Sequence, residues 1–358
     1  MNENNRRLHD QGQSLWVDNI TRSMLDDGDL ERYIAELSVT GLTSNPTIFD
    51  KAISGGSDYD AQIAELSSEL DDPEQIFFGL AFDDLRRAAD LFAETHKRTA
   101  GVDGFVSLEV SPLLADDTEA TIRQAIDLHK RADRENLFIK IPGTPAGLPA
   151  IEQVIFEGVP VNVTLLFSRE QYQAAADAYM KGVERRIEAG LNPAVNSVAS
   201  LFLSRWDVAV VDEVPDTLRA KLGIAIGRRC YAAYRELIAS DRSQRLANEG
   251  AMTQRLLMAS TGTKDPEASD VLYVEALGAP HTVNTMPEAT LLAYADHGVT
   301  GDPIAPDGGD AEEVLADYVA GGFDIDELAA RLQQEGKDSF AKSWHDLMGT
   351  IENQTSGS

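Results

Sequence analysis

The chain has 358 residues, of which 43% are hydrophobic and 25% are charged, a balance that is typical of globular proteins and excludes a disordered or fibrous chain. Its formal net charge of −29 argues against partners such as nucleic acid or an anionic membrane, because phosphate-rich surfaces are bound by basic ones. No apolar run is long enough, at about 18 residues, to predict a membrane-spanning helix.

The start of the chain and its cysteine content favour a cytoplasmic protein. The segment MNENNRRLHD lacks the apolar core of a secretory signal. A single cysteine, Cys230, excludes an internal disulfide framework, and its helical surroundings predict a packed thiol. The histidines are scattered and no phosphate-loop or dinucleotide motif is present, so we expect neither a metal nor another cofactor.

From residue 14 to residue 297, short apolar segments alternate with long amphipathic ones. The segments with strand character are 14–18, 38–43, 104–110, 137–142, 159–167, 195–203, 254–260 and 281–286. The segments with helical character are 73–98, 118–133, 147–157, 168–189, 215–249 and 287–297. Eight strands separated by helices indicate parallel pairing with right-handed crossovers, which favours an α/β fold of the closed (β/α)8 TIM-barrel type. An open doubly wound sheet is the alternative.

Several helix starts are marked by capping residues. Thr118 and Ser168 precede acidic first turns, and Pro287 precedes Glu288. The long helical segment before residue 104 predicts an insertion between the second and third strands, after an exposed loop at 54–60.

The pattern changes after residue 300. Residues 301–310 are typical of a loop, 311–320 and 325–350 of helices, and the tail ENQTSGS of a frayed end. We therefore expect a barrel domain over 1–300 and a C-terminal helical extension over 301–358 that packs on the barrel; the alternative is a linker to a fused domain.

Lys140 lies within the apolar segment LFIKIP at 137–142, which predicts a buried strand. A charged ammonium is costly in such a place, and burial favours the neutral form of a lysine. A neutral amine is a nucleophile toward carbonyls, as in Schiff-base enzymes. The alternative is a lysine at a strand end that reaches water.

Polar residues share one face on several neighbouring strands, because successive strand residues point to opposite faces. Asn162 and Thr164 alternate with Val161, Val163, Leu165 and Phe167. Ser107 and Glu109 alternate with Val106, Leu108 and Val110. Lys140 shares its face with Phe138, and Asp18 with Trp16. These polar groups lie toward the carboxyl ends of their strands, where barrel active sites are assembled.

This set of groups suits chemistry through a lysine imine. A lysine attacks a ketone, and a carboxylate with a hydroxyl can hold the water that shuttles protons. A second carboxylate can take a hydroxyl proton when a C–C bond breaks beside the iminium, and amides can fix the ketone's hydroxyls. No metal is required, because the iminium is the electron sink.

Five segments resemble the signatures of the transaldolase family: WVDNITRSML, GLTSNPTIF, VSLEVSPLLADD, FIKIPGTPAGLPAIEQ and VNVTLLFS. The resemblance runs from about residue 14 to residue 297 in the family's order. The length and the segment NTMPEATLLAYADHG resemble the long, actinobacterial-like bacterial branch. The resemblance implies a transferase of the pentose phosphate pathway that moves a dihydroxyacetone unit between sugar phosphates.

The resemblance assigns catalytic roles by position. Lys140 matches the lysine that forms the Schiff base. Asp18 matches the general acid/base that handles the C4 hydroxyl proton. Glu109 and Thr164 match the pair that holds the catalytic water.

It also assigns substrate contacts. Asn45 and Asn162 match amides that bind the dihydroxyacetone unit, and Ser200 matches a serine that touches the same unit. Phe202 matches an aromatic whose replacement by tyrosine marks the related fructose-6-phosphate aldolases, so phenylalanine favours transfer over cleavage. Arg205 matches a phosphate-binding arginine.

One segment departs from the family pattern. Many members have Ser-Phe-Arg after the seventh strand, whereas this chain has Ser260 followed by Thr-Gly-Thr and Lys264. Lys264 could replace the arginine as a point charge, the backbone N–H groups of 261–263 could form an anion nest, or Lys264 could be a solvated loop residue.

Three functions remain open on the sequence. The first is a transaldolase acting on sedoheptulose 7-phosphate or fructose 6-phosphate with glyceraldehyde 3-phosphate or erythrose 4-phosphate. The second is an aldolase that releases free dihydroxyacetone. The third is a protein without catalysis, either a sugar-phosphate sensor or an enzyme that has lost its activity. The sequence leaves open whether the chain is a monomer or a homodimer.

Overall fold

The computed structural model describes residues 1–356; the last two residues of the tail expected to fray lie outside it. Eight strands are present: β1 (Gln13–Asp18), β2 (Val39–Thr43), β3 (Val106–Glu109), β4 (Leu137–Pro142), β5 (Val161–Leu166), β6 (Ser197–Phe202), β7 (Arg255–Ala259) and β8 (Thr282–Met286). Each lies within or overlaps one predicted strand segment, so the predicted strand order is confirmed.

All strand pairs are parallel, in the order β2-β1-β8-β7-β6-β5-β4-β3. Two backbone hydrogen bonds join the ends of this order: Leu42 N donates to Phe105 O at 2.9 Å, and Gly104 N donates to Thr40 O at 2.9 Å. The sheet therefore closes on itself as a (β/α)8 barrel, as predicted, and not as an open doubly wound sheet.

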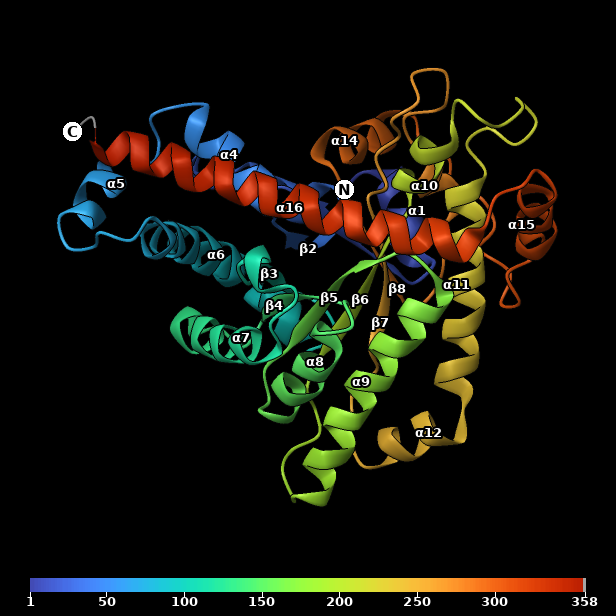
Figure 1. The fold of residues 1–358 in the computed structure, drawn as a ribbon, viewed down its shortest axis with the longest axis horizontal. Helices are drawn as coiled ribbons and strands as arrows, with labels where there is room; N and C mark the ends of the chain where they lie inside the picture. Colours follow the sequence, from blue (N-terminus) through green and yellow to red (C-terminus); the bar gives the residue numbers. More distant parts are fainter. Residues whose placement is uncertain (357–358) are drawn as a thin grey trace.

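Helices surround the strands (Figure 1). Those before and between the first four strands are α1 (Glu3–Asp10), α2 (Arg22–Asp26), α3 (Asp29–Glu36), α4 (Pro46–Ser54), α5 (Asp60–Ser67), α6 (Pro73–Arg98), the short 3-10 helix η1 (Pro112–Leu114) and α7 (Thr118–Ala132). Those that follow β4 to β7 are α8 (Gly147–Phe156), α9 (Arg169–Glu188), α10 (Ser204–Val210), α11 (Leu222–Ala239), α12 (Asp241–Asn248) and α13 (Leu272–Ala276). Those that follow β8 are α14 (Glu288–His297), α15 (Ala311–Ala320) and α16 (Ile325–Ser356).

Three local predictions are wrong. The segment 215–249 is not one helix: Ser240 has extended backbone angles (φ −68°, ψ 151°) and caps α12 through its hydroxyl. The first turn of α7 is capped by Asp117, which accepts from Ala120 N, and not by Thr118. The tail does not fray before Ser356, because α16 continues to that residue. Ser168, in contrast, forms the full capping box with Gln171 at the start of α9.

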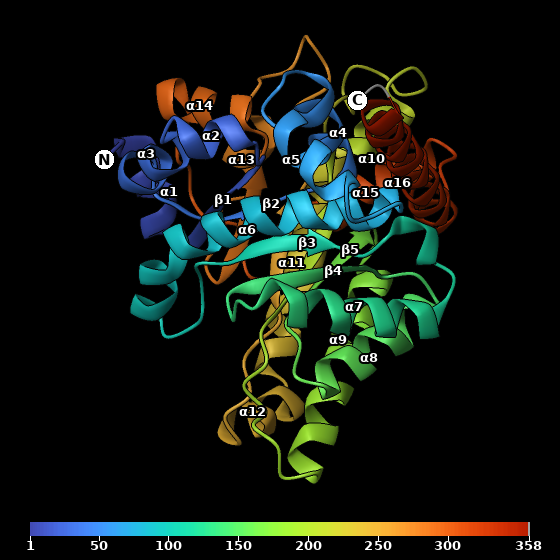
Figure 2. The ribbon, with the colours of Figure 1, turned by 90° about the vertical axis from the view of Figure 1, so that its left-hand side faces the viewer.

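The helix α16 crosses the barrel end that carries the carboxyl ends of the strands. Figure 1 shows it as the long red helix above the strands, and Figure 2 shows α12 at the opposite end of the molecule. The side chain of Gln333 donates to Gly143 O at 3.2 Å and to Leu165 O at 2.9 Å, immediately beyond β4 and within β5. The domain division at residue 300 stays a prediction, but these bonds tie α16 to the carboxyl ends of β4 and β5.

The interior of the barrel contains a layer of apolar side chains. Trp16, Phe105, Phe138, Val198, Leu257, Ala259 and Val283 form one buried cluster inside the barrel. The rings of Phe105 and Phe138 stack with centroids 4.1 Å apart. Gly41 permits this packing, because a Cβ there would lie 2.6 Å from the Trp16 ring. This layer fills the barrel beneath the polar side chains that lie toward the carboxyl ends of the strands.

No helix among residues 1–356 is long and apolar enough to cross a membrane.

Candidate active site

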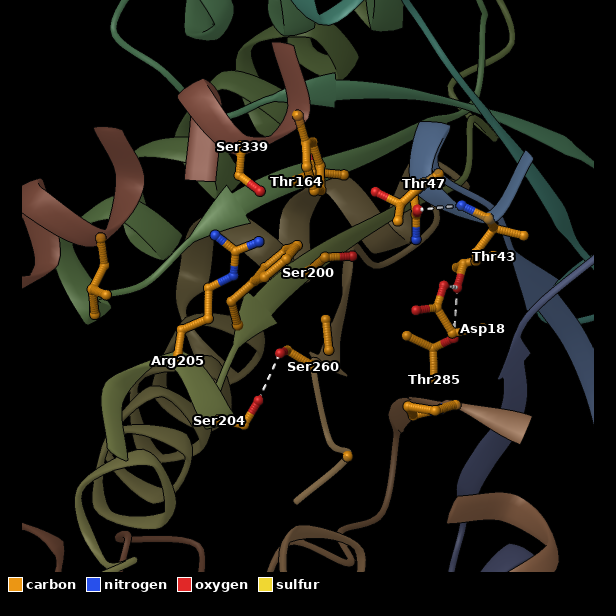
Figure 3. Close-up of a pocket in the computed structure, with 18 of the residues that line it drawn as sticks. Asp18, Thr43, Thr47, Thr164, Ser200, Ser204, Arg205, Ser260, Thr285 and Ser339 are labelled. Carbon is orange, nitrogen blue, oxygen red and sulfur yellow. Dashed lines mark hydrogen bonds between the residues drawn. The ribbon is translucent and has the colours of Figure 1, made fainter. Parts of the chain in front are cut away.

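A cavity of about 780 Å³ opens at the carboxyl ends of the strands. Ten of the eleven predicted site residues line it: Asp18, Asn45, Lys140, Asn162, Thr164, Ser200, Phe202, Arg205, Ser260 and Lys264. The eleventh, Glu109, lies behind Lys140 and contacts it. Figure 3 shows Asp18 with Thr43 and Thr285 at one end of the cavity, and Arg205, Ser204 and Ser260 at the other.

Strand register brings the central groups together. Glu109 of β3 lies beside Lys140 of β4, and Lys140 lies beside Asn162 of β5. Because parallel strands place register partners on the same face, these three side chains form one layer above the aromatic cluster.

The Lys140 amine is buried, with its side chain 7% exposed. Nζ donates to Ser44 O at 2.6 Å and lies 3.2 Å from Glu109 Oε2. This arrangement fixes the nitrogen at the cavity floor and provides a carboxylate that can accept a proton from it. The alternative of a lysine that reaches water at a strand end does not fit this burial.

Glu109 is held in an environment that disfavours its charge. Burial raises the pKa of its carboxyl, while the adjacent Lys140 ammonium lowers it. Its Oε1 and the Thr164 hydroxyl are buried and make no hydrogen bond of good geometry among residues 1–356. The Thr164 hydroxyl is nevertheless close enough to Glu109 to lower the pKa of its carboxyl, so the two groups can hold one ordered water between them.

Asp18 ends β1, and its side chain lines the same cavity as the amine. Burial raises the pKa of its carboxyl; Lys140, the Thr43 hydroxyl and Lys264 act in the other direction. Thr43 donates to Asp18 Oδ1 at 2.7 Å, and its hydroxyl is also 2.7 Å from the hydroxyl of Thr285. The two threonines hold the carboxyl in one orientation.

The amide of Asn162 is oriented from both sides. Its Oδ1 accepts from the Ser200 hydroxyl at 2.7 Å, and its Nδ2 donates to the Ser107 hydroxyl at 3.3 Å. Asn45 caps α4 by accepting from Ile48 N at 3.1 Å, which leaves its Nδ2 as the amide group not used by the cap. Both amides can therefore donate to a bound hydroxyl.

Phe202 and Arg205 form the far wall with the C-terminal helix. The Phe202 ring lies 5.5 Å from the ring of Phe167 and 6.3 Å from that of Phe340 in α16. The Arg205 guanidinium lies over the Phe202 ring at 5.8 Å and donates no hydrogen bond to another residue in 1–356. Burial lowers the pKa of Arg205, so an anion at this position would relieve an unfavourable desolvation.

Ser260 and Lys264 belong to the loop after β7. Ser260 has a positive φ of 55°, and its hydroxyl is 2.8 Å from that of Ser204. Lys264 is exposed at the cavity wall. The loop after β7 therefore brings one lysine side chain to the cavity wall, four residues after Ser260.

Sequence reasoning missed the contribution of α16. Leu332, Glu335, Ser339 and Phe340 line the cavity, and Figure 3 shows the Ser339 hydroxyl directed into it. Thr43, Thr285 and Ser204 were also missed, although each carries a hydroxyl and lies within two residues of the carboxyl end of a strand. That position was the available signal for these three; none existed for α16, which is distant in the sequence.

No group of three or more histidine, cysteine or acidic side chains able to hold a metal ion occurs within the described part of the chain.

Comparisons with known proteins agree with this geometry. The family model "Transaldolase/Fructose-6-phosphate aldolase" matches residues 15–351. A transaldolase of Saccharopolyspora erythraea is 47% identical over 360 residues, covering 99% of this chain and 98% of the relative. A transaldolase of Mycolicibacterium smegmatis is 46% identical over 362 residues, with 99% and 98% covered, and one of Mycobacterium tuberculosis is 46% identical over 357 residues, with 97% and 96% covered. The chain therefore belongs to the transaldolase/fructose-6-phosphate aldolase family.

Proposed function

We propose that this protein is a transaldolase that transfers a dihydroxyacetone unit from a ketose phosphate to an aldose phosphate. The observation that carries the proposal is the buried amine of Lys140, 3.2 Å from Glu109, in a cavity that Asp18 enters from another strand. The named relatives, all called transaldolase, support the same activity. The donors would be sedoheptulose 7-phosphate or fructose 6-phosphate, and the acceptors glyceraldehyde 3-phosphate or erythrose 4-phosphate, as in the pentose phosphate pathway.

The first half-reaction forms and uses an imine. Lys140 Nζ attacks the C2 carbonyl of the ketose, and the carbinolamine loses water to give an iminium. Glu109 and Thr164 hold the water that carries protons during this dehydration. Asp18 takes the C4 hydroxyl proton, the C3–C4 bond breaks, and its electron pair moves to the iminium to give an enamine while the aldose leaves.

The second half-reaction reverses these steps on the acceptor. The enamine carbon attacks the aldehyde of the acceptor, Asp18 returns the proton to the new hydroxyl, and water hydrolyses the iminium to release the ketose product. The amides of Asn45 and Asn162, with Ser200, would keep the three-carbon unit in place between the two halves.

The phosphate end of the substrate would lie toward Arg205, Ser260 and Lys264. Arg205 and Lys264 both line the cavity with donors that no residue in 1–356 occupies. In a chain with a net charge of −29, these two cations supply the local positive field that an anionic sugar needs.

Borohydride trapping tests the proposal directly. Incubation with fructose 6-phosphate and borohydride should give a reduced dihydroxyacetone adduct on Lys140, identified by intact mass and peptide mapping. An adduct on another lysine would contradict the assignment of Lys140, and a folded protein that forms none would favour the sensor.

Acceptor dependence separates the transferase from the aldolase. Net turnover of fructose 6-phosphate should require erythrose 4-phosphate, because glyceraldehyde 3-phosphate as the acceptor would only regenerate the donor. Steady release of free dihydroxyacetone without an acceptor would identify the lyase instead.

A further inference from the structure

The loop that carries Lys264 is fastened on both sides of this residue. On the side nearer β7, the fully buried Thr261 donates to Asn284 Oδ1 and to Thr285 O, both at 3.0 Å. Thr263 donates to Ser269 O at 2.7 Å and closes the loop on itself. Lys264 lies between these bonds and Asp265, and its own amine donates to no residue in 1–356.

On the other side, Asp265 is held by an arginine from a different part of the chain. Arg219 Nε donates to Asp265 Oδ2 at 2.6 Å, and its Nη2 donates to Oδ1 at 2.9 Å. A third nitrogen, Nη1, lies 2.6 Å from the carboxylate of Glu267. Asp265 also accepts from Glu267 N at 3.0 Å, so the carboxylate orders the turn that follows Lys264.

This ion pair differs from an ordinary surface pair in its geometry. The two parallel hydrogen bonds use the planar fork of arginine, which adds directional restraint to charge attraction. The Asp265 side chain is 14% exposed, less than most of the chain's ion-paired carboxylates. The hydrogen bond from Arg219 holds the pKa of Asp265 below its usual range, so the pair stays charged at neutral pH.

Arg219 acts through Asp265 and not on a ligand in the main cavity. It lines a neighbouring cavity of about 230 Å³, which shares Ser204, Val208 and Lys264 with the main one. The boundary between the two cavities is therefore formed by α10 and the Lys264 loop.

We propose that Arg219 is a positioning residue that, through its ion pair with Asp265, holds Lys264 as the phosphate-binding cation that replaces the absent arginine after β7. This inference rests on the proposed function, because it names the group that recognises the substrate's phosphate. A lysine on an unrestrained loop would lose conformational freedom on binding, and the pair removes most of that cost in advance.

Steady-state kinetics with fructose 6-phosphate and erythrose 4-phosphate test the inference. Lys264→Ala should raise KM for fructose 6-phosphate about tenfold, since a charge-assisted hydrogen bond to phosphate is lost. Arg219→Ala should raise the same KM about three- to fivefold, with kcat changed less than twofold. The Ki of inorganic phosphate as a competitive inhibitor should rise in parallel in both variants.

The double variant distinguishes positioning from a separate structural effect. In the Lys264→Ala background, Arg219→Ala should change KM by less than about 1.5-fold, because the group it positions is gone. Arg228→Ala is the matched control: Arg228 pairs with Asp310 at 2.6 Å, is 32% exposed against 33% for Arg219, and does not line either cavity. If Arg219→Ala proves poorly folded, Asp265→Asn tests the same ion pair in its place. This substitution keeps the size of the side chain and should also raise KM.

Three results would overturn the inference. They are an unchanged KM in Lys264→Ala, additive effects of the two substitutions, or an Arg219→Ala variant that behaves like Arg228→Ala. Each is distinguishable from failure of the proposed function, since in that case the unaltered protein would trap no imine with unphosphorylated dihydroxyacetone and transfer nothing to an acceptor.

Discussion

Two buried carboxylates lie near the ends of β3, Asp103 before the strand and Glu109 at its carboxyl end, and their hydrogen-bond partners differ. Asp103, just before the strand, accepts from the Ser14 hydroxyl, from Trp16 Nε1 at 2.8 Å and from Gly104 N at 3.0 Å, with Arg255 4.0 Å away. Glu109, at the strand's end, has one charged neighbour on Oε2 and an Oε1 without a partner in 1–356.

The difference separates a stabilising carboxylate from a reactive one. Asp103 has used its acceptor capacity on the protein, so it fastens the amino-terminal end of the barrel. Glu109 keeps capacity free, and burial raises the pKa of its carboxyl. A perturbed, partly satisfied carboxyl beside the amine at the cavity floor is suited to proton transfer. Four predictions test and sharpen this comparison.

Loss of the amine should have the largest effect. Lys140→Ala should lower kcat at least about a thousandfold and abolish the borohydride adduct, because no other lysine among residues 1–356 is buried in this cavity. Lys181→Ala is the control, since that lysine pairs with Asp177 on an exposed helix face. Thermal unfolding should show a folded protein, and a few per cent of residual activity would exclude the imine mechanism.

Loss of the C4 base should come next. Asp18→Asn should lower kcat by about 10²–10⁴-fold, the usual range for a general base. The amide oxygen can still accept the hydrogen bond from the Thr43 hydroxyl. The imine should still be trapped, because Lys140 remains. Equal loss of trapping and turnover would show that Asp18 acts before C–C cleavage.

Removal of the stabilising carboxylate should affect folding and not turnover. Asp103→Ala leaves Trp16 Nε1 and the Ser14 hydroxyl without their acceptor and removes the carboxylate that lies 4.0 Å from Arg255, so the free energy of unfolding should fall by about 3 kcal/mol. Urea unfolding and kcat at 25 °C measure the two effects. Glu109→Gln is the counterpart: it should lower kcat strongly and change the free energy of unfolding less than Asp103→Ala does. If Asp103→Ala mainly lowered kcat and Glu109→Gln mainly lowered stability, the comparison would be refuted.

Removal of a distant charge should have the smallest effect, visible in the pH profile. Asp18 must be ionised to act as a base, so kcat/KM should fall as the pH drops through its raised pKa. Lys264 favours the ionised form. Lys264→Ala should therefore raise the pKa further and move the acidic limb to higher pH, by less than about one unit.

A second lysine of the same cavity provides the control. Lys51 also lines the cavity but is not among the groups that shift the pKa of Asp18. Lys51→Ala should leave the acidic limb in place. An equal movement in both variants would show a general effect of cavity charge.

The strands and the central layer of the site were predictable because their signals are local. Alternation along β4 and β5 puts Lys140, Asn162 and Thr164 on one face whatever the rest of the chain does. That alternation fails only after Thr164, where the register between β5 and β6 shifts and Leu165 has a φ of 56°. The shift leaves Leu165 O free to accept from Gln333 of α16. The alternation of side chains along a strand cannot predict such a bond.

By itself, the sequence determined the order of strands, the face that carries the chemistry and the family to which the chain belongs, since each depends on residues close together in the chain. Only the tertiary structure decided what surrounds those groups: the threonine pair that orients Asp18, the cavity wall from α16, and the arginine that restrains Lys264. Thr43 lies 25 positions from Asp18 and 242 from Thr285 in the sequence, and Arg219 lies 46 positions from Asp265. Closing the barrel brings them together, and no local pattern encodes which distant side chains will meet.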